Sequence, residues 1–390
     1  MEFHAPARLP PGFRCAAIHC GIKHEGADLA LFAADRPCTA AAVFTRNHVV
    51  GAPVVVGRER VRAGRLQAVV VNSRVSNVGT GDEGVRRARR MGDAAAAALG
   101  LDPSLVLMSS TGVIGVPLPV EKIERALPAL AAALQDDPLE GARGIMTTDT
   151  HPKALSLDVP GSDAVLTVVA KGSGMIAPNM ATMLAYAFTD AELDAAALDA
   201  CLRRVVDVTL NMVSVDGDTS TSDTCALLAS GRAGPVAADA LEEALHVALT
   251  RMAEVLARDG EGATRLLRVT VTGARHRLDA RRIARSLVDS PLVKTMVHGA
   301  DPNAGRILMA VGKCFECQVE PDRIGARLGG VAVVEAGLRV EFDERALRTL
   351  LSGDPVDLEV DLGIGEGRAR AWGCDLTAGY VEENAAYYST

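Results

Sequence analysis

The hydrophobic and polar positions of the chain alternate in blocks that predict strands first and a helix later. Short apolar runs at Ala40–Phe44, Val54–Val56 and Leu66–Val71 are separated by Gly, Pro and Asn residues, the pattern of strands joined by turns. The block Asp82–Leu99 instead repeats its apolar residues at helical spacing and is followed by Gly100, a residue type that ends helices. The opening of the chain is therefore predicted to be rich in sheet, with one long amphipathic helix.

The same alternation of blocks continues through the middle of the chain. It predicts two buried strands, Leu105–Met108 and Val165–Ala170, and three helices, Val120–Leu134, Leu193–Val208 and Glu242–Ala257. Thr189 or Asp190 is expected to cap the second of these helices. Periodicity alone thus predicts mixed α and β content and does not choose among folds.

The stretch Lys171–Leu184 interrupts this pattern directly after a buried strand. It has two glycines and a proline ahead of Thr182, which indicates an unusual backbone path. The small Ala181 leaves the Thr182 hydroxyl room to attack the carbonyl of the residue before it. If that bond broke, Thr182 would carry a hydroxyl nucleophile and an α-amine with a pKa of about 7.7–8.0 that can serve as its base. The alternative is an ordinary loop threonine, the commoner role after such a turn.

Three other polar stretches are candidates for binding or catalysis. Ser109–Gly115 follows a strand with small hydroxyl and Gly residues, which can donate hydrogen bonds to a developing oxyanion or form a plain turn. Gly144–Lys153 crowds three Thr and an Asp beside Ile and Met, which suits a pocket edge or a hydrogen-bonded turn. Glu261 lies between two glycines and is interpreted either as a ligand for an ammonium group or as a solvated side chain.

Composition limits the classes of function that the chain can have. The net charge of −8, the pI near 5.6 and the aromatic content of 3% argue against a nucleic-acid partner. The basic clusters Arg86–Arg90 and Arg275–Arg285 occur in helical patterns and are interpreted as solvated helix faces. The 390 residues, 48% of them hydrophobic, can bury a large core, yet no segment has the length of a signal peptide or a membrane span. A soluble, cytoplasmic protein without a membrane partner is expected.

Metal binding is not predicted by any spacing of ligands. The eight cysteines are scattered along the chain and are expected to be free thiols, and Cys314–Cys317 is a single C-x-x-C without a second pair at zinc spacing. The acidic stretch Asp216–Leu227 suggests a calcium loop, but Thr221 stands where such a loop needs Gly and Leu227 where it needs Glu.

Several segments together resemble the ornithine acetyltransferase (glutamate N-acetyltransferase) family. They cover nearly the whole chain in the expected order and comprise Ser109–Gly115, Gly144–Lys153, Lys171–Leu184, Val215–Asp223, Asp259–Ala263, Asp289–Arg306 and the tail Asn384–Thr390. The resemblance implies an α/β fold, a layered α-β-β-α sandwich of the self-cleaving acetyltransferase and aminopeptidase superfamily. It also implies that the chain cuts itself between Ala181 and Thr182. The fragments 1–181 and 182–390 would then form one intertwined catalytic unit, and two such pairs a dimer, which is a heterotetramer.

Residue roles are carried over from the same resemblance. It implies Thr182 as the nucleophile and Thr111 and Gly112 as the oxyanion hole. It further implies a set of residues that contact the substrate: Thr148, Lys171, Thr182, Glu261, Asn384 and Ser389. The implied reaction is a double displacement that moves an acetyl group from N-acetylornithine to glutamate in arginine synthesis, without a metal or an organic cofactor. Some members of the family also accept acetyl-CoA.

Departures from the family pattern keep the substrate open. Asn72–Gly79 replaces a run of smaller residues, and Ser222, Ala304 and Glu383 stand where Asn, Trp and Ile are usual. A member recruited to a specialised pathway, acting on a related N-acyl amino acid, is therefore an alternative. An amidohydrolase that releases the acyl group to water and a non-catalytic amino-acid-binding protein are two others.

Overall fold

The computed structural model describes residues 1–177 and 183–385, which form two compact units. Of the described residues, the first unit comprises 1–172, 183–207 and 219–252. The second comprises residues 173–177, 208–218 and 253–385. Each unit contains one β-sheet with helices against it, so the predicted mixed α/β class is confirmed.

The sheet of the first unit has eight strands in the order β4-β3-β2-β9-β7-β6-β5, with β1 paired to β2. Its strands are β1 (Phe13–Ile18), β2 (Leu29–Phe44), β3 (Arg65–Asn72), β4 (Val106–Ser110), β5 (Lys153–Asp158), β6 (Val165–Lys171), β7 (Leu184–Glu192) and β9 (Thr224–Pro235). Strands β7 and β9 follow residue 182 in the chain, yet they lie between β2 and β6, which precede residue 181. The sheet therefore interleaves the two halves of the chain.

The long strand β2 bends this sheet back on itself. Its first half pairs with β1 and β3, its second half pairs with β9, and the register shifts between Ala33 and Cys38. Phe32 on the first half consequently stacks on Phe188 of β7, with ring centroids 5.2 Å apart. The two halves of the sheet thus face each other across a shared core, which gives the two inner layers of the predicted sandwich.

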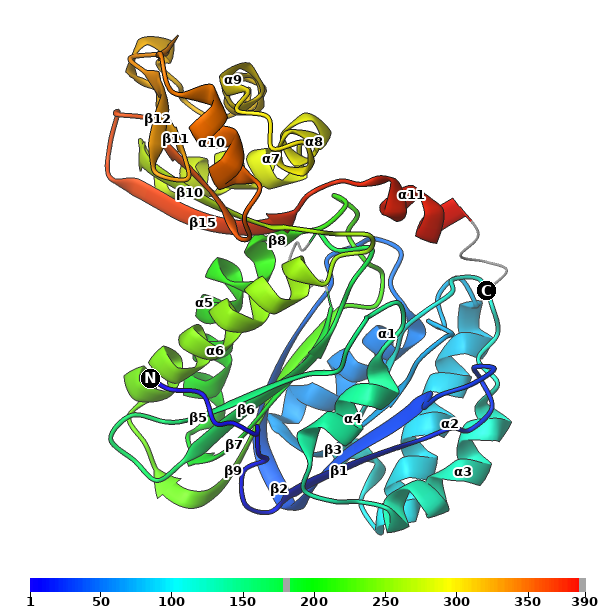
Figure 1. The fold of residues 1–390 in the computed structure, drawn as a ribbon. Coiled ribbons are helices and arrows are strands. Elements are labelled where there is room, and N and C mark those ends of the chain that lie inside the picture. Colours follow the sequence, from blue (N-terminus) through cyan, green and yellow to red (C-terminus); the bar gives the residue numbers. More distant parts are fainter. Residues whose placement is uncertain (178–182, 386–390) are drawn as a thin grey trace. The chain divides into compact units, whose positions relative to one another are not determined.

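Helices cover the outer faces of both layers. Helices α1 (Ala52–Arg60), α2 (Gly81–Leu99) and α3 (Val120–Ala132) pack on the layer of β2, β3 and β4, and α4 (Pro138–Ile145) packs in the inner core. Helices α5 (Ala195–Val208) and α6 (Ala238–Arg258) lie beside β7 and β9 (Figure 1). An ion pair between Arg204 and Glu242 joins these two helices. This order of layers is the predicted α-β-β-α arrangement.

The second unit contains a seven-stranded sheet in the order β13-β12-β11-β14-β10-β15-β8. Its strands are β8 (Val213–Ser214), β10 (Leu266–Ala274), β11 (Gly325–Leu328), β12 (Val331–Glu335), β13 (Leu338–Arg339), β14 (Val356–Asp361) and β15 (Gly367–Cys374). Its helices are α7 (Arg277–Asp289), α8 (Pro291–His298), α9 (Ala304–Gly312), α10 (Glu344–Leu351) and α11 (Ala378–Ala385). No helix among the described residues is long and apolar enough to cross a bilayer.

Most elements predicted from periodicity are confirmed, and two details are wrong. Val54–Val56 lies in α1 rather than in a strand, because Pro53 starts a helix there and Val54 and Val56 are buried. Thr189 and Asp190 do not cap α5, because both belong to β7. All eight cysteines are free thiols, as predicted.

Candidate functional site

In the first unit, a cluster of predicted residues is built around Lys171 at the end of β6. Every residue of this strand is buried, and Lys171 pairs with Leu184, the first residue of β7. The Lys171 Nζ donates hydrogen bonds to Thr147 Oγ1 at 2.7 Å and to Thr111 Oγ1 at 3.5 Å. Thr147 was not singled out in the sequence, although its neighbour Thr148 was, and Thr148 lies in the same turn between α4 and β5.

The single carboxylate of Asp149 lies close to two ammonium groups, those of Lys153 and Lys171. Its Oδ1 accepts hydrogen bonds from Lys153 Nζ and from the Gly172 N–H, both at 2.7 Å, and its Oδ2 lies 4.0 Å from Lys171 Nζ. Burial opposes ionisation of this carboxyl, but Lys171 and Lys153 outweigh burial and hold the pKa of Asp149 at about 2. Asp149 is therefore a carboxylate at every physiological pH.

Thr111 and Gly112 follow β4 and are fixed by the backbone at the end of β3 and directly after it. The Thr111 N–H donates to Asn72 O at 3.0 Å, and the Val113 N–H donates to Arg74 O at 2.9 Å. Gly112 has a φ of +125°, and a Cβ there would lie 2.2 Å from the carbonyl carbon of Arg74, so only glycine fits. Arg74 itself has a φ of +81°, a left-handed backbone conformation that is uncommon for a residue with a side chain.

The Gly112 N–H has the geometry of an available donor. The N–H groups of Thr111 and Val113 donate hydrogen bonds to backbone carbonyls, whereas the Gly112 N–H has no acceptor within the part of the chain that the structure describes. The Thr111 hydroxyl lies one residue away and already accepts a hydrogen bond from Lys171. A backbone N–H beside a hydroxyl, next to a buried cation, is an arrangement that can stabilise an oxyanion.

In the second unit, two residues that the sequence predicts as substrate contacts, Glu261 and Asn384, lie together. Asn384 on α11 donates from Nδ2 to Glu261 Oε2 at 2.8 Å, and the Glu261 N–H donates to Ser173 O at 3.0 Å. Glu261 is only 6% exposed, so it is not the solvated side chain of the alternative interpretation.

Two glycines allow the close packing around Glu261. A Cβ on Gly174 would lie 2.2 Å from the Glu261 carboxyl carbon, and a Cβ on Gly262 would lie 2.3 Å from Tyr380 N. The sequence places Gly262 directly after Glu261, but it does not show that Gly174 packs against the Glu261 carboxylate. The predicted residues Ala181, Thr182 and Ser389 lie outside the described residues.

Asp223, the last residue of the acidic stretch Val215–Asp223, is a second buried carboxyl. It directly precedes β9, and the N–H of the following Thr224 donates to Met183 O at 3.0 Å. Asp223 Oδ2 has no hydrogen-bond partner among the described residues. Burial raises the pKa of Asp223 well above its usual range, although Ser220, Lys171 and Thr45 partly oppose the shift. The buried carboxyls of Asp149 and Asp223 therefore differ: the pKa of Asp149 is lowered and that of Asp223 is raised.

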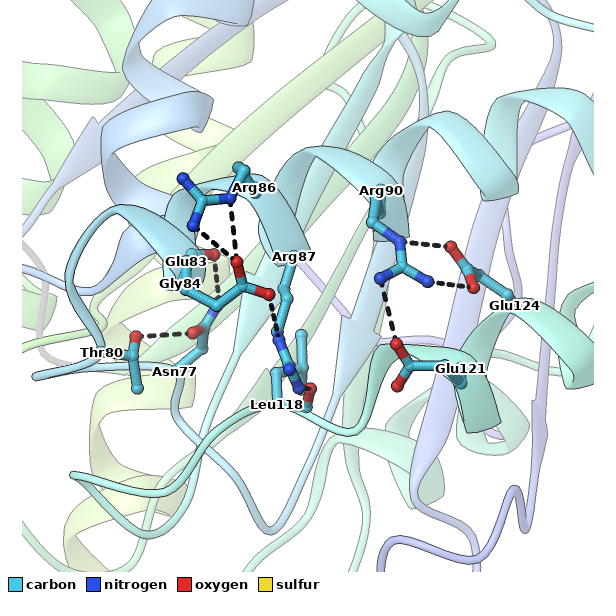
Figure 2. A network of polar contacts seen from close by, with 10 residues as sticks. All are labelled: Asn77, Thr80, Glu83, Gly84, Arg86, Arg87, Arg90, Leu118, Glu121 and Glu124. Carbon is cyan, nitrogen blue, oxygen red and sulfur yellow. Dashed lines mark hydrogen bonds and ion pairs between the residues drawn. The ribbon is translucent and has the colours of Figure 1, made fainter.

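The basic cluster Arg86–Arg90 is a solvated helix face rather than a binding site. Glu83 accepts hydrogen bonds from both Arg86 and Arg87 on α2, and Arg90 reaches Glu121 and Glu124 on α3 (Figure 2). The remaining arginine of the cluster, Arg89, pairs with Glu59. Because each arginine faces a carboxylate, the cluster presents little net positive charge to a ligand.

Comparison with known proteins shows to which family this chain is similar. The model of the ArgJ family matches residues 14–389. The chain is 47% identical over 391 residues to the arginine biosynthesis bifunctional protein ArgJ of Symbiobacterium thermophilum, covering 97% of both chains. It is 45% identical over 387 residues to the glutamate N-acetyltransferase Oat2 of Streptomyces clavuligerus, covering 97% of this chain and 98% of the relative.

One solved structure with a similar sequence covers less than half of this chain. The ornithine acetyltransferase of Mycobacterium tuberculosis, solved in complex with ornithine, is 37% identical over 44% of this chain and 94% of its own, with a TM-score of 0.42. The family match spans nearly the full length, and the identity to the curated relatives extends across both units. The chain therefore belongs to the ArgJ family.

Proposed function

We propose that this ArgJ-family acyltransferase first cuts its own chain between Ala181 and Thr182. The Thr182 hydroxyl attacks the Ala181 carbonyl, the peptide C–N bond breaks as the Thr182 nitrogen gains a proton, and an ester remains. Water then hydrolyses the ester. The products are a carboxylate on Ala181 and a Thr182 that carries a free α-amine beside its hydroxyl.

The cut enzyme then transfers an acetyl group in two steps. The α-amine takes the proton of the Thr182 hydroxyl, whose oxygen attacks the acetyl carbonyl of N-acetylornithine, and ornithine leaves with a protonated amine. Glutamate attacks the acetyl-threonine in the same way and leaves as N-acetylglutamate. In both steps the Thr111 hydroxyl and the Gly112 N–H hold the oxyanion, a contribution of about 2.7–4 kcal/mol for each donor.

The observation that carries this proposal is the available Gly112 N–H beside the Thr111 hydroxyl and Lys171. Lys171 pairs with Leu184, which follows Thr182 by two residues in the chain. Because Thr182 is only two residues from Leu184 in the chain, this pairing supports Thr182 as the nucleophile whose oxyanion these donors stabilise. The ammonium of Lys171 suits a substrate carboxylate, and the Glu261 carboxylate of the second unit suits a substrate ammonium.

The interleaved sheet supports a further part of the proposal, that the two fragments stay together. After cleavage, β7 and β9 of fragment 182–390 would remain hydrogen-bonded between β2 and β6 of fragment 1–181. Their shared apolar core would have to be exposed for the fragments to separate. We extend the proposal to a dimer of such pairs, with Thr148 and Ser389 as further substrate contacts.

Mass measurement on denatured protein tests the first step. We expect the wild type to give two masses, those of residues 1–181 and 182–390, and a Thr182→Ala variant to give one full-length mass. Incubation of the cut protein with N-acetylornithine and glutamate should then yield ornithine and N-acetylglutamate in equal amounts. An uncut wild type contradicts the mechanism, and acetate in place of N-acetylglutamate would identify a hydrolase instead.

A further inference from the structure

Lys171 is a nearly buried lysine with several polar contacts inside the protein. Its side chain is 8% exposed, and beneath it Asp149 and Lys153 form an ion pair whose two side chains are fully buried. The carboxylate of Asp149 also accepts hydrogen bonds from the N–H groups of Gly172 and Thr147. Gly172 follows Lys171 in the chain, and Thr147 is its hydrogen-bond partner. Asp149 therefore fixes both the backbone at Lys171 and the turn that carries Thr147.

The hydrogen bond from Lys171 to Thr111 has a defined direction. An ammonium group donates and cannot accept, so the Thr111 oxygen is the acceptor in the 3.5 Å contact. The hydroxyl hydrogen of Thr111 is thereby left to point to another acceptor. A hydroxyl whose oxygen accepts from a cation is also polarised and becomes a stronger donor, above all in a buried site.

We propose that Lys171, anchored by Asp149, is a positioning residue for the Thr111 hydroxyl in addition to any contact with a substrate carboxylate. The inference rests on the proposed function, in which Thr111 donates to the oxyanion. Lys171 orients the Thr111 hydrogen toward the acyl oxygen and increases its acidity as negative charge develops there. The ion pair with Asp149 keeps the ammonium in place when no substrate is bound.

The two roles of Lys171 differ in the substrates that they affect. A lysine that only binds the substrate carboxylate acts on amino-acid substrates and does nothing for an acyl donor without a carboxylate. A lysine that positions Thr111 acts on every acyl donor. The uncharged ester p-nitrophenyl acetate separates the two: the Thr182 oxygen takes its acetyl group, p-nitrophenolate leaves, and water releases acetate from the enzyme.

The test is a double-mutant cycle on ester turnover by the cut enzyme. We expect Lys171→Met to lower kcat for p-nitrophenyl acetate about tenfold, a part of the ~10²–10³-fold loss seen when an oxyanion donor is removed. In a Thr111→Ala background, the same substitution should change kcat less than about twofold, since there is no hydroxyl left to position. Lys313→Met, a change of the same kind at an exposed lysine, serves as the control and should leave turnover as it is.

Three results would overturn the inference. Lys171→Met could raise KM for N-acetylornithine while ester kcat stays constant, or it could lower ester kcat equally in both backgrounds. If Lys171→Met does not cut itself, Asp149→Asn takes its place in the cycle, because that variant keeps Lys171 and removes the carboxylate that anchors it. An unchanged kcat for the ester in Asp149→Asn is the third result that would overturn the inference. Failure of the proposed function would look different, since the wild type itself would then stay uncut or would not be acetylated on Thr182.

Discussion

Two clusters of charged side chains have similar contact distances and opposite surroundings. In the buried cluster of Asp149, Lys153 and Lys171, the Asp149–Lys153 contact is 2.7 Å and both side chains have no exposed surface. In the surface cluster of Figure 2, Arg90 and Glu124 are also 2.7 Å apart, but their side chains are 43% and 31% exposed. Distance alone does not distinguish the two clusters.

Burial determines what each contact contributes. Water and salt screen the arginine cluster, and ordering of its long side chains offsets most of the attraction between charges. In the buried cluster, each charge has lost its hydration and depends on its partners, so removing one partner leaves an uncompensated charge. The same kind of contact is therefore dispensable on α2 and indispensable beside β6.

The largest expected effect is that of removing the shared carboxylate. Asp149→Ala removes the carboxylate that the buried Lys153 and Lys171 ammonium groups share, and we expect the free energy of unfolding to fall by about 3–5 kcal/mol. Denaturation of the variant with urea, beside the wild type, measures the loss. A fall below about 1 kcal/mol would mean that the buried cluster behaves as a surface cluster.

Acid should remove part of the same stabilisation. The pKa of Asp149 is about 2 in the folded protein against 3.8 for an ordinary aspartate, so the folded state binds this proton more weakly than the unfolded state. The stabilisation is thus present above pH 3.8 and is lost as the pH falls toward 2, by about 2 kcal/mol in all. The stability difference between wild type and Asp149→Asn should shrink over that interval; a constant difference would contradict the assigned pKa.

The smallest effect is expected in the surface cluster. Arg90→Ala removes both carboxylate contacts of Arg90, and we expect the unfolding midpoint to move by a small fraction of the change caused by Asp149→Ala. Any change should vanish at about 1 M salt, where charges are screened within about 3 Å. A large, salt-independent loss would remove the distinction between the clusters.

Sequence patterns were informative where one local rule determines the structure. Gly100 ends α2 in a left-handed conformation with a φ of +69°, as a glycine after a helical block should. The pattern failed at Val54–Val56, where tertiary burial makes a helix of a β-branched run. It also could not show that β2 bends and that β7 and β9 insert beside it, because strand order depends on contacts between distant segments.

The candidate site was predictable in its residue types but not in its connections. Motifs identified Lys171, Thr111 and Glu261, whereas Asp149 and Thr147 emerged only from the structure. An aspartate in a Thr-rich turn has no local signal that distinguishes a solvated side chain from one that bridges two buried lysines. Asp223 is similar, since its burial follows from the pairing of β9 with β7.

The central claim, that Thr182 carries the acetyl group, is tested most directly by trapping the acyl-enzyme. Cut protein is mixed with N-acetylornithine in the absence of glutamate, quenched in acid and analysed by peptide mass mapping. We predict one acetyl group on the fragment that begins at Thr182, located on the threonine side chain, and its loss when glutamate is added before the quench. An uncut chain, or an acetyl group on any other residue, would contradict the mechanism.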